Sequence, residues 1–208
     1  MPNLNVNKEI TRAISREAMA ELPIRRYQGE VCLVDTPQSL HRARTEMSEE
    51  NIVGLDTETR PAFVKGVHHL PCLVQVATAR CVYLFPLRWH EAFPLLAQML
   101  ADTRIVKVGI SIADDLRALK EVFSFEAQNI IDAGGVAKLH GLEQSGLRNM
   151  AGIFLGFRIP KGKQTSNWAA AHLSPAQIVY AATDAWACRE LYLYFRESGW
   201  LMDHKGNA

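Results

Sequence analysis

The sequence contains no apolar stretch long enough to cross a membrane, because no run approaches the roughly 18 residues that a spanning helix needs. Its first ten residues, MPNLNVNKEI, also lack the basic start and apolar centre of a secretory signal. We therefore expect no membrane partner and a cytoplasmic location.

Cysteine is scarce, and its spacing follows no pattern. The chain has four cysteines, at positions 32, 72, 81 and 188, and no CxxC pair. Such spacing is typical of buried free thiols and disfavours a disulfide framework or a zinc ribbon. His68, His69 and Cys72 lie close together, but no second ligand pair follows at the spacing of a zinc site.

Excess charge of one sign is also absent, since 23 basic and 22 acidic side chains leave a net charge of +1. A protein that holds a nucleic-acid duplex by charge alone is usually much more basic. A nucleic-acid partner would therefore require a local basic patch or bound cations. What the chain does have is 48% apolar residues in a length of 208, which suits one domain with a sizeable core.

Apolar and β-branched runs predict strands, and helical periodicity predicts helices between and after them. Strands are expected at residues 31–34, 51–55, 72–78, 81–85, 105–108 and 129–131. Helices are expected at 8–22, from a cap at Asp35 or Thr36 to Met47, and at 113–122, 133–140, 146–155 and 175–196. This alternation predicts an α/β domain at residues 31–208, with a mixed sheet flanked by helices, behind a helical extension at 1–30 packed on the main body.

Two carboxylates stand directly after the apolar run at 51–55, as Asp56-Thr57-Glu58. Side chains two residues apart on an extended segment point to the same face, and α/β folds usually place their chemistry at strand ends. Taken alone, the pair is more typical of a solvated strand end than of a functional site.

Another acid, Asp184, lies one helical turn after Tyr180 within the apolar segment YAATDA. A carboxylate among apolar neighbours is costly to bury unless it is paired or bound to a metal. The structural alternative is a hydrogen bond between the two side chains that serves only helix packing.

Asp114 and Asp115 lie where a predicted strand gives way to a helix, a position that also suits ordinary charges at a helix N-terminus. If all three acidic segments met in one pocket, the repulsion between carboxylates would raise their pKa values unless cations lay between them. Oxygen ligands favour Mg²⁺ or Mn²⁺ over zinc, and two such ions suit in-line attack on phosphate.

Three sequence blocks, in this order, resemble the DEDD exonuclease superfamily. VGLDTET supplies Asp56 and Glu58, VGISIADDL supplies Asp115 with Asp114 as the adjoining alternative, and YAATDA supplies Tyr180 and Asp184. The Tyr-x-x-x-Asp form is similar to the tyrosine subclass. The resemblance covers about residues 31–196, and LPCLVQVAT and GLRNMAGIFLGFRIPKGKQTSNW resemble segments of ribonuclease D and of the Werner-type exonuclease domain.

That resemblance implies a 3′–5′ exonuclease with an RNase H-like fold, a central five-stranded mixed sheet with helices on both sides. It implies release of nucleoside monophosphates from a single-stranded 3′ end with two Mg²⁺ or Mn²⁺ ions. Asp56 would bridge both ions, and Glu58 and Asp184 would complete one site. Asp115 would support the other through water, while Tyr180 would orient the attacking water.

The segment RIPKGKQTSN, residues 158–167, predicts a polar, basic loop that faces the substrate. Arg158, Lys161 and Lys163 are candidate phosphate contacts, with a solvated loop as the alternative, and Thr57 is a further candidate for substrate binding. Trp168 is expected in the core rather than as a stacking platform.

Two other functions fit part of the pattern. A nucleic-acid-binding module would keep the fold without the activity, although all five catalytic positions carry competent residues. A phosphatase acting on small esters would use the carboxylates but leaves the basic loop without a role. RNA and DNA stay equally open as substrates, because no motif reads the 2′-hydroxyl.

Overall fold

The computed structural model describes residues 12–62, 66–163 and 165–201, which form a six-stranded sheet in the order β1-β4-β3-β2-β5-β6. The strands are β1 (Glu30–Leu33), β2 (Ile52–Thr59), β3 (Pro71–Ala77), β4 (Cys81–Pro86), β5 (Val106–Gly109) and β6 (Ile130–Asp132). The predicted α/β class and all six predicted strand segments are confirmed. The expected count of five strands in the sheet is wrong, because β1 joins the edge by pairing in parallel with β4.

The sheet is mixed, as predicted. β3 pairs antiparallel with β2 and β4, whereas the β1–β4, β2–β5 and β5–β6 pairs are parallel. The β3–β4 hairpin turns at Ala79 and Arg80, where the Thr78 N–H donates to the Cys81 carbonyl over 2.9 Å. β2 lies inside the sheet between β3 and β5; its first residues, Ile52 to Gly54, pair with β5, and its end from Gly54 to Thr59 pairs with β3.

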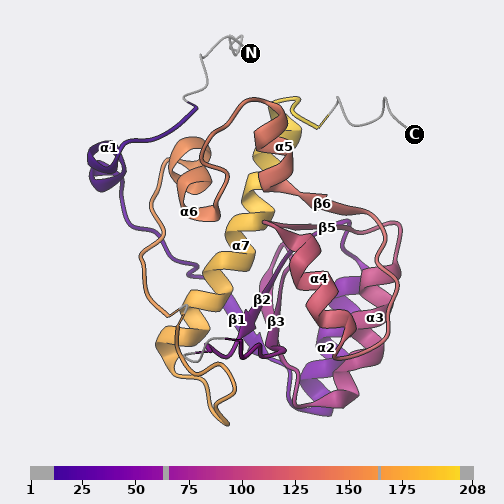
Figure 1. Ribbon diagram of the computed structural model, residues 1–208. Helices are drawn as coiled ribbons and strands as arrows, with labels where there is room; N and C mark the ends of the chain where they lie inside the picture. Colours follow the sequence, from indigo (N-terminus) through magenta and orange to yellow (C-terminus); the bar gives the residue numbers. More distant parts are fainter. Residues whose placement is uncertain (1–11, 63–65, 164, 202–208) are drawn as a thin grey trace.

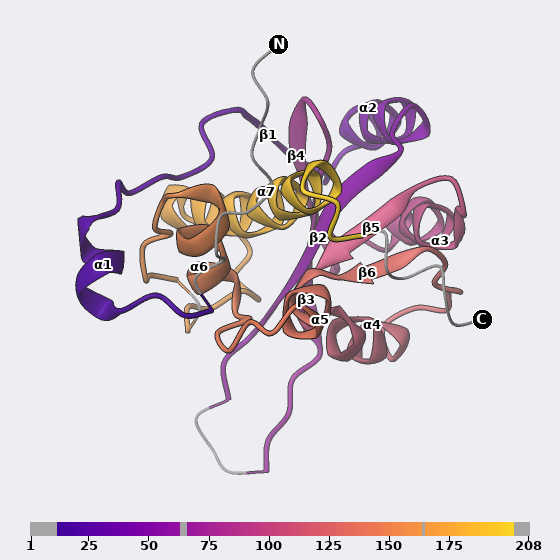
Figure 2. The ribbon, with the colours of Figure 1, turned by 90° about the horizontal axis from the view of Figure 1, so that it is seen from above.

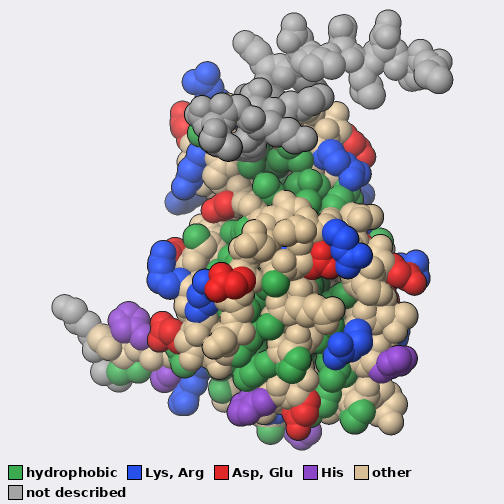
Figure 3. All heavy atoms as spheres, turned by 90° about the vertical axis from the view of Figure 1, so that its right-hand side faces the viewer, with side chains coloured by type: hydrophobic (Ala, Val, Ile, Leu, Met, Phe, Trp, Pro, Cys, Tyr) green, Lys and Arg blue, Asp and Glu red, His purple; other side chains and the backbone are tan. Residues whose placement is uncertain are grey.

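Helices cover both faces of the sheet (Figures 1 and 2). α2 (Pro37–Ser48), α3 (Phe93–Ala101) and α4 (Ile112–Lys120) pack into one apolar core, and α5 (Ala133–Leu139), α6 (Leu147–Met150) and α7 (Pro175–Glu197) pack on the opposite face. A 3-10 turn, η1 (His90–Ala92), leads into α3, which lies outside the predicted helices. The side of the molecule seen in Figure 3 carries interspersed acidic and basic side chains, in keeping with the small net charge.

Local sequence explains how the long helix α7 begins. Ser174 caps it, since its hydroxyl accepts from the Gln177 N–H while the Gln177 side chain binds the Ser174 backbone. Pro175 follows at the first helical position, where its fixed φ suits the helix and its missing N–H costs nothing. In the described part of the chain, no helix combines the length and apolar character that crossing a bilayer requires.

Two predicted helices differ from the structure. Of the helix expected at 8–22, residues 8–11 lie outside the described part of the chain. The rest begins only at α1 (Arg16–Glu21), because the Ser15 hydroxyl caps it by accepting from the Ala18 N–H. The helix expected at 146–155 is α6 followed by a π-helical turn, η2 (Ala151–Leu155), that ends at Gly156 with a left-handed φ of 69°. The division into an extension and a main domain stays a prediction.

Candidate active site

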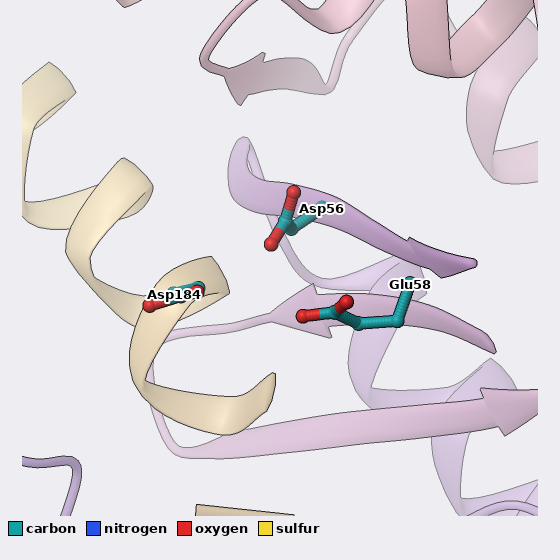
Figure 4. A group of neighbouring side chains, drawn as sticks. All are labelled: Asp56, Glu58 and Asp184. Atoms are coloured by element: carbon teal, nitrogen blue, oxygen red, sulfur yellow. The ribbon is translucent and has the colours of Figure 1, made fainter. Parts of the chain in front are cut away.

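Acids from distant parts of the sequence meet at the end of β2, beside α7. Asp56 and Glu58 project from β2 toward Asp184, which projects from α7 (Figure 4). One carboxylate oxygen from each of the three lies within 4.8 Å of the others. We call Asp56, Glu58 and Asp184 the acidic cluster.

A glycine in β2 allows this close approach. A Cβ at Gly54 would lie 2.0 Å from the Ala185 carbonyl oxygen and 2.9 Å from the Arg189 nitrogen, both in the backbone of α7. Gly54 lies two residues before Asp56 in the strand and therefore faces the same side of the sheet. Any larger residue at position 54 would push α7, and with it Asp184, away from the strand.

Asp115 lies in α4, next to the acidic cluster but outside it. The Thr57 hydroxyl donates a 2.6 Å hydrogen bond to Asp115 Oδ1, so Thr57, a predicted substrate contact, holds this acid in place. Asp114 instead forms an ion pair with Arg117 at 2.7 Å, and its side chain is 77% exposed. The structure thus turns Asp115, and not Asp114, toward the site.

Burial raises the pKa values of these carboxyls, and repulsion from neighbouring carboxylates of the site adds to it at Asp56 and Glu58. Burial, followed by repulsion from Asp56, raises the pKa of Glu58 to about 9. Burial is also the largest cause that lifts the pKa values of Asp56, Asp184 and Asp115 above their usual range. A divalent cation among the carboxylates would favour their ionised forms, and a set of carboxylate oxygens fits a hard cation such as Mg²⁺ or Mn²⁺.

A buried amide adjoins the acidic cluster. Gln75 of β3 stands opposite Asp56 in the β2–β3 ladder and is 0% exposed. Within residues 12–62, 66–163 and 165–201, neither the nitrogen nor the oxygen of its side chain has a hydrogen-bond partner. Because buried polar groups are rarely left unsatisfied, this amide suits a site that holds water or an ion next to Asp56.

Tyr180 stands one turn before Asp184, and its hydroxyl accepts a 3.5 Å hydrogen bond from Arg148 Nη2. Burial, together with the negative charge of Asp184, holds the pKa of Tyr180 above its usual range, so its hydroxyl keeps its proton at neutral pH. A hydrogen bond from Tyr180 and, after it, the positive charge of Arg148 lower the pKa of Asp184 and so partly oppose the effect of burial. The prediction did not include Arg148, since a single arginine on a short helix has no pattern that distinguishes it from a surface charge.

Two cavities meet at Tyr180. One of about 370 Å³ opens over the acidic cluster and is also lined by Arg148 and Asn149. The other, of about 450 Å³, is lined by Lys161 and Lys163 of the predicted basic loop.

The third basic residue of that loop lies elsewhere. Arg158 lines neither cavity, because its Nε donates to the Leu22 carbonyl over 3.1 Å and so holds the N-terminal segment. Trp168 is 2% exposed, which confirms its predicted place in the core.

Comparison with known proteins places this geometry in context. A sequence model of 3′–5′ exonuclease domains matches residues 31–200. The chain is 32% identical to ribonuclease D of Haemophilus influenzae over 148 residues, which are 69% of this chain and 36% of that protein. It is 29% identical to a 3′–5′ exonuclease of Arabidopsis thaliana, with 95% of this chain and 77% of that protein covered.

The fold has counterparts among solved structures. The EXO domain of Aedes aegypti Nibbler superposes with a TM-score of 0.74 at 20% identity, covering 88% of this chain and 94% of that one. The predicted RNase H-like fold is thereby confirmed. The chain spans less than half the length of several curated relatives that it matches, so their full activities do not transfer to it directly.

Proposed function

The chain belongs to the 3′–5′ exonuclease family, and from that premise we propose that it hydrolyses the terminal phosphodiester bond of a nucleic-acid strand and releases nucleoside monophosphates. The observation that carries the proposal is the acidic cluster, three carboxylates within 4.8 Å, with Tyr180 and an open cavity beside it. Packing of the fold alone does not explain three carboxylates so close together, because their repulsion is costly without a cation.

We infer that two divalent ions, Mg²⁺ or Mn²⁺, bind at this site. Asp56, Glu58 and Asp184 would supply direct oxygen ligands, and Asp115, held by Thr57, would contribute through water. Ions bound there would supply Lewis acidity toward the scissile phosphate. The raised pKa values of the carboxyls support this assignment, since cations relieve the repulsion that raises them.

The remaining residues of the cavity fit the handling of water and phosphate. Tyr180 keeps its proton, so its hydroxyl can hold the attacking water, as the resemblance implied. The Arg148 guanidinium lies beside that hydroxyl and is a donor for a phosphate oxygen. Lys161 and Lys163 would bind the strand from the neighbouring cavity, whereas Arg158 would act indirectly by holding the N-terminal segment against the loop.

A direct test compares three 5′-labelled substrates, single-stranded RNA, single-stranded DNA and a duplex with a recessed 3′ end, each with Mg²⁺, Mn²⁺ or EDTA. The proposal predicts a ladder of shortened labelled products with either metal and none with EDTA. Asp114→Asn is the matched control for Asp115→Asn, because only Asp115 faces the site. Wild-type protein that bound the strands but left them intact in both metals would contradict the activity.

A further inference from the structure

Residues 22–27 form an extended segment that we call the N-terminal strap, and it precedes the region that the family model matches. The strap lies alongside the chain that follows η2 (Figure 1). The Arg158 N–H donates to the Pro23 carbonyl over 2.9 Å, and the Arg25 N–H donates to the Arg158 carbonyl over 3.1 Å. These bonds place Ile24 and Arg158 in a parallel bridge, which fixes the strap next to the start of the basic loop.

The strap is also attached to α7. The Tyr27 N–H donates to the Thr183 hydroxyl over 3.0 Å, and the Tyr27 ring packs near Trp186 with centroids 6.0 Å apart. On the other side of Arg26, the guanidinium of Arg25 lies 5.7 Å from the centroid of the Phe157 ring. Both neighbours of Arg26 are therefore anchored, so its backbone is held in one place.

Arg26 lines the 450 Å³ cavity together with Lys161 and Lys163, and we call this cavity the basic groove. Its floor is largely apolar and includes Ile159 and Val179. Tyr180 lines both the basic groove and the cavity over the acidic cluster, so the two adjoin.

The basic loop itself lies close to the tyrosine ring, since a Cβ added at Gly162 would stand 3.8 Å from Tyr180 Cδ2. A strand that ended at the acidic cluster would therefore pass directly from Tyr180 into the basic groove.

The charge of the groove differs from that of the whole chain. Three cations line it and no acidic side chain does, although the net charge of the protein is only +1. Among the ion pairs of the described residues, none involves Arg26, Lys161 or Lys163. A ligand that combines anionic groups with flat apolar surface fits such a groove, and an unpaired nucleotide has both.

We propose that the basic groove holds the nucleotides on the 5′ side of the scissile bond, with Arg26 of the N-terminal strap binding their phosphates beside Lys161 and Lys163. The proposal rests on the proposed function, because in a 3′–5′ exonuclease only the terminal nucleotide lies beyond the scissile phosphate. It adds to the substrate site a residue that lies outside the matched family region, residues 31–200.

The test measures binding of a 5′-fluorescein-labelled single-stranded oligonucleotide by anisotropy in EDTA, where metal-dependent cleavage does not occur. Arg26→Ala is expected to raise the Kd about tenfold at low salt, the loss of one charge-assisted contact. The slope of log Kd against log salt is expected to fall by about 0.7, the value for one phosphate of a single strand. Arg16→Ala, which removes another exposed arginine, from α1, should change neither quantity.

Arg26→Lys keeps the charge and should keep the salt slope, which separates a phosphate contact from a structural role. Thermal unfolding of each variant checks that the strap stays folded. If wild-type protein cleaves the strand in Mg²⁺ but Arg26→Ala binds it like the Arg16→Ala control, the groove proposal is wrong and the proposed function stands. Binding that depends on Arg26 without cleavage in Mg²⁺ or Mn²⁺ would overturn the proposed function instead.

Discussion

Buried carboxylates lie on both faces of the sheet, and their surroundings differ. On the face covered by α2, Glu46 is 8% exposed and accepts hydrogen bonds from the hydroxyls of Thr78 and Tyr83, the latter at 2.7 Å. On the face covered by α7, the carboxylates of the acidic cluster face one another within 4.8 Å.

The difference shows how a structural acid is told from a functional one. Glu46 has two hydroxyl donors from its own chain, so both of its carboxylate oxygens accept hydrogen bonds within the fold. The acidic cluster gathers like charges, and burial makes their repulsion more costly. Under the proposed function the partner of these carboxylates is a divalent cation, which carboxylate oxygens suit.

The largest expected effect is on the rate of cleavage, which should depend on the acidic cluster and not on Glu46. Asp56→Asn should lower the rate of cleavage of a 5′-labelled oligonucleotide in Mg²⁺ by about a thousandfold or more, because metal-ion stabilisation is worth several kcal/mol. Glu46→Gln is the matched change of acid to amide on the other face, and it should leave the rate per folded molecule unchanged. A similar loss in both variants would contradict the distinction.

Beside the acidic cluster, we expect Tyr180 to contribute to the rate of cleavage through its hydroxyl more than through its ring. Tyr180→Phe keeps the ring packed near Trp168, at a centroid distance of 6.0 Å, but removes the donor that holds water. We expect the single-turnover rate to fall about a hundredfold, the lower end of effects for positioned proton donors and acceptors, with little change in KM. Tyr192→Phe, on the same helix but among the apolar residues near α5, is the control and should retain full activity.

Stability should change in opposite directions at the two sites. Glu46→Ala leaves the buried Tyr83 hydroxyl without an acceptor, although the Thr78 hydroxyl can still donate to the Cys81 carbonyl, and it should destabilise the protein by about 2 kcal/mol. In EDTA, Asp56→Asn should instead stabilise it by about 1 kcal/mol, because the amide needs neither a proton nor a cation to lie buried beside Glu58 and Asp184. Urea unfolding followed by circular dichroism measures both, and a loss of stability in both variants would count against the comparison.

The smallest effect is a pH dependence confined to the acidic cluster. Glu58 has a pKa of about 9 in the folded protein against 4.5 ordinarily, so between these values the folded state holds a proton that the unfolded state has released. Stability in EDTA should therefore fall as pH rises from about 5 to 9. Calorimetry should show a steeper fall in Tm for wild type than for Glu58→Gln, by about 3 °C for each pH unit within this range. Parallel curves for the two proteins would rule out this contribution of Glu58.

Much of the fold follows from local patterns, and the exceptions have local causes. The helix α3 could not be predicted from periodicity, because FPLLAQMLA is apolar on nearly all sides. Pro94 at its start is nevertheless a recognisable helix signal. β1 is the sixth strand of the sheet because it pairs with β4, and no local pattern in the sequence specifies that pairing.

The acids of the site could be predicted, and even the choice between neighbours is visible in the sequence. Asp115 lies three residues after Ile112 and four before Leu119, both buried, so it shares their face of α4, whereas Asp114 does not. Arg26 and Arg148 could not be found, because each reaches the site only through tertiary contacts. Charge alone makes Arg158 a candidate for substrate binding, but it does not tell which way the side chain points, and in the structure the side chain binds the Leu22 carbonyl.

The most direct test of the account is a titration with Mn²⁺, followed by the electron paramagnetic resonance signal of the free ion. Wild type and Glu46→Gln should bind Mn²⁺ with the same affinity and stoichiometry, since Glu46 already has its partners within the fold. Asp184→Asn should bind far more weakly, because one ligand of the acidic cluster is lost. Equal binding by wild type and Asp184→Asn would contradict the claim that the acidic cluster is a metal site.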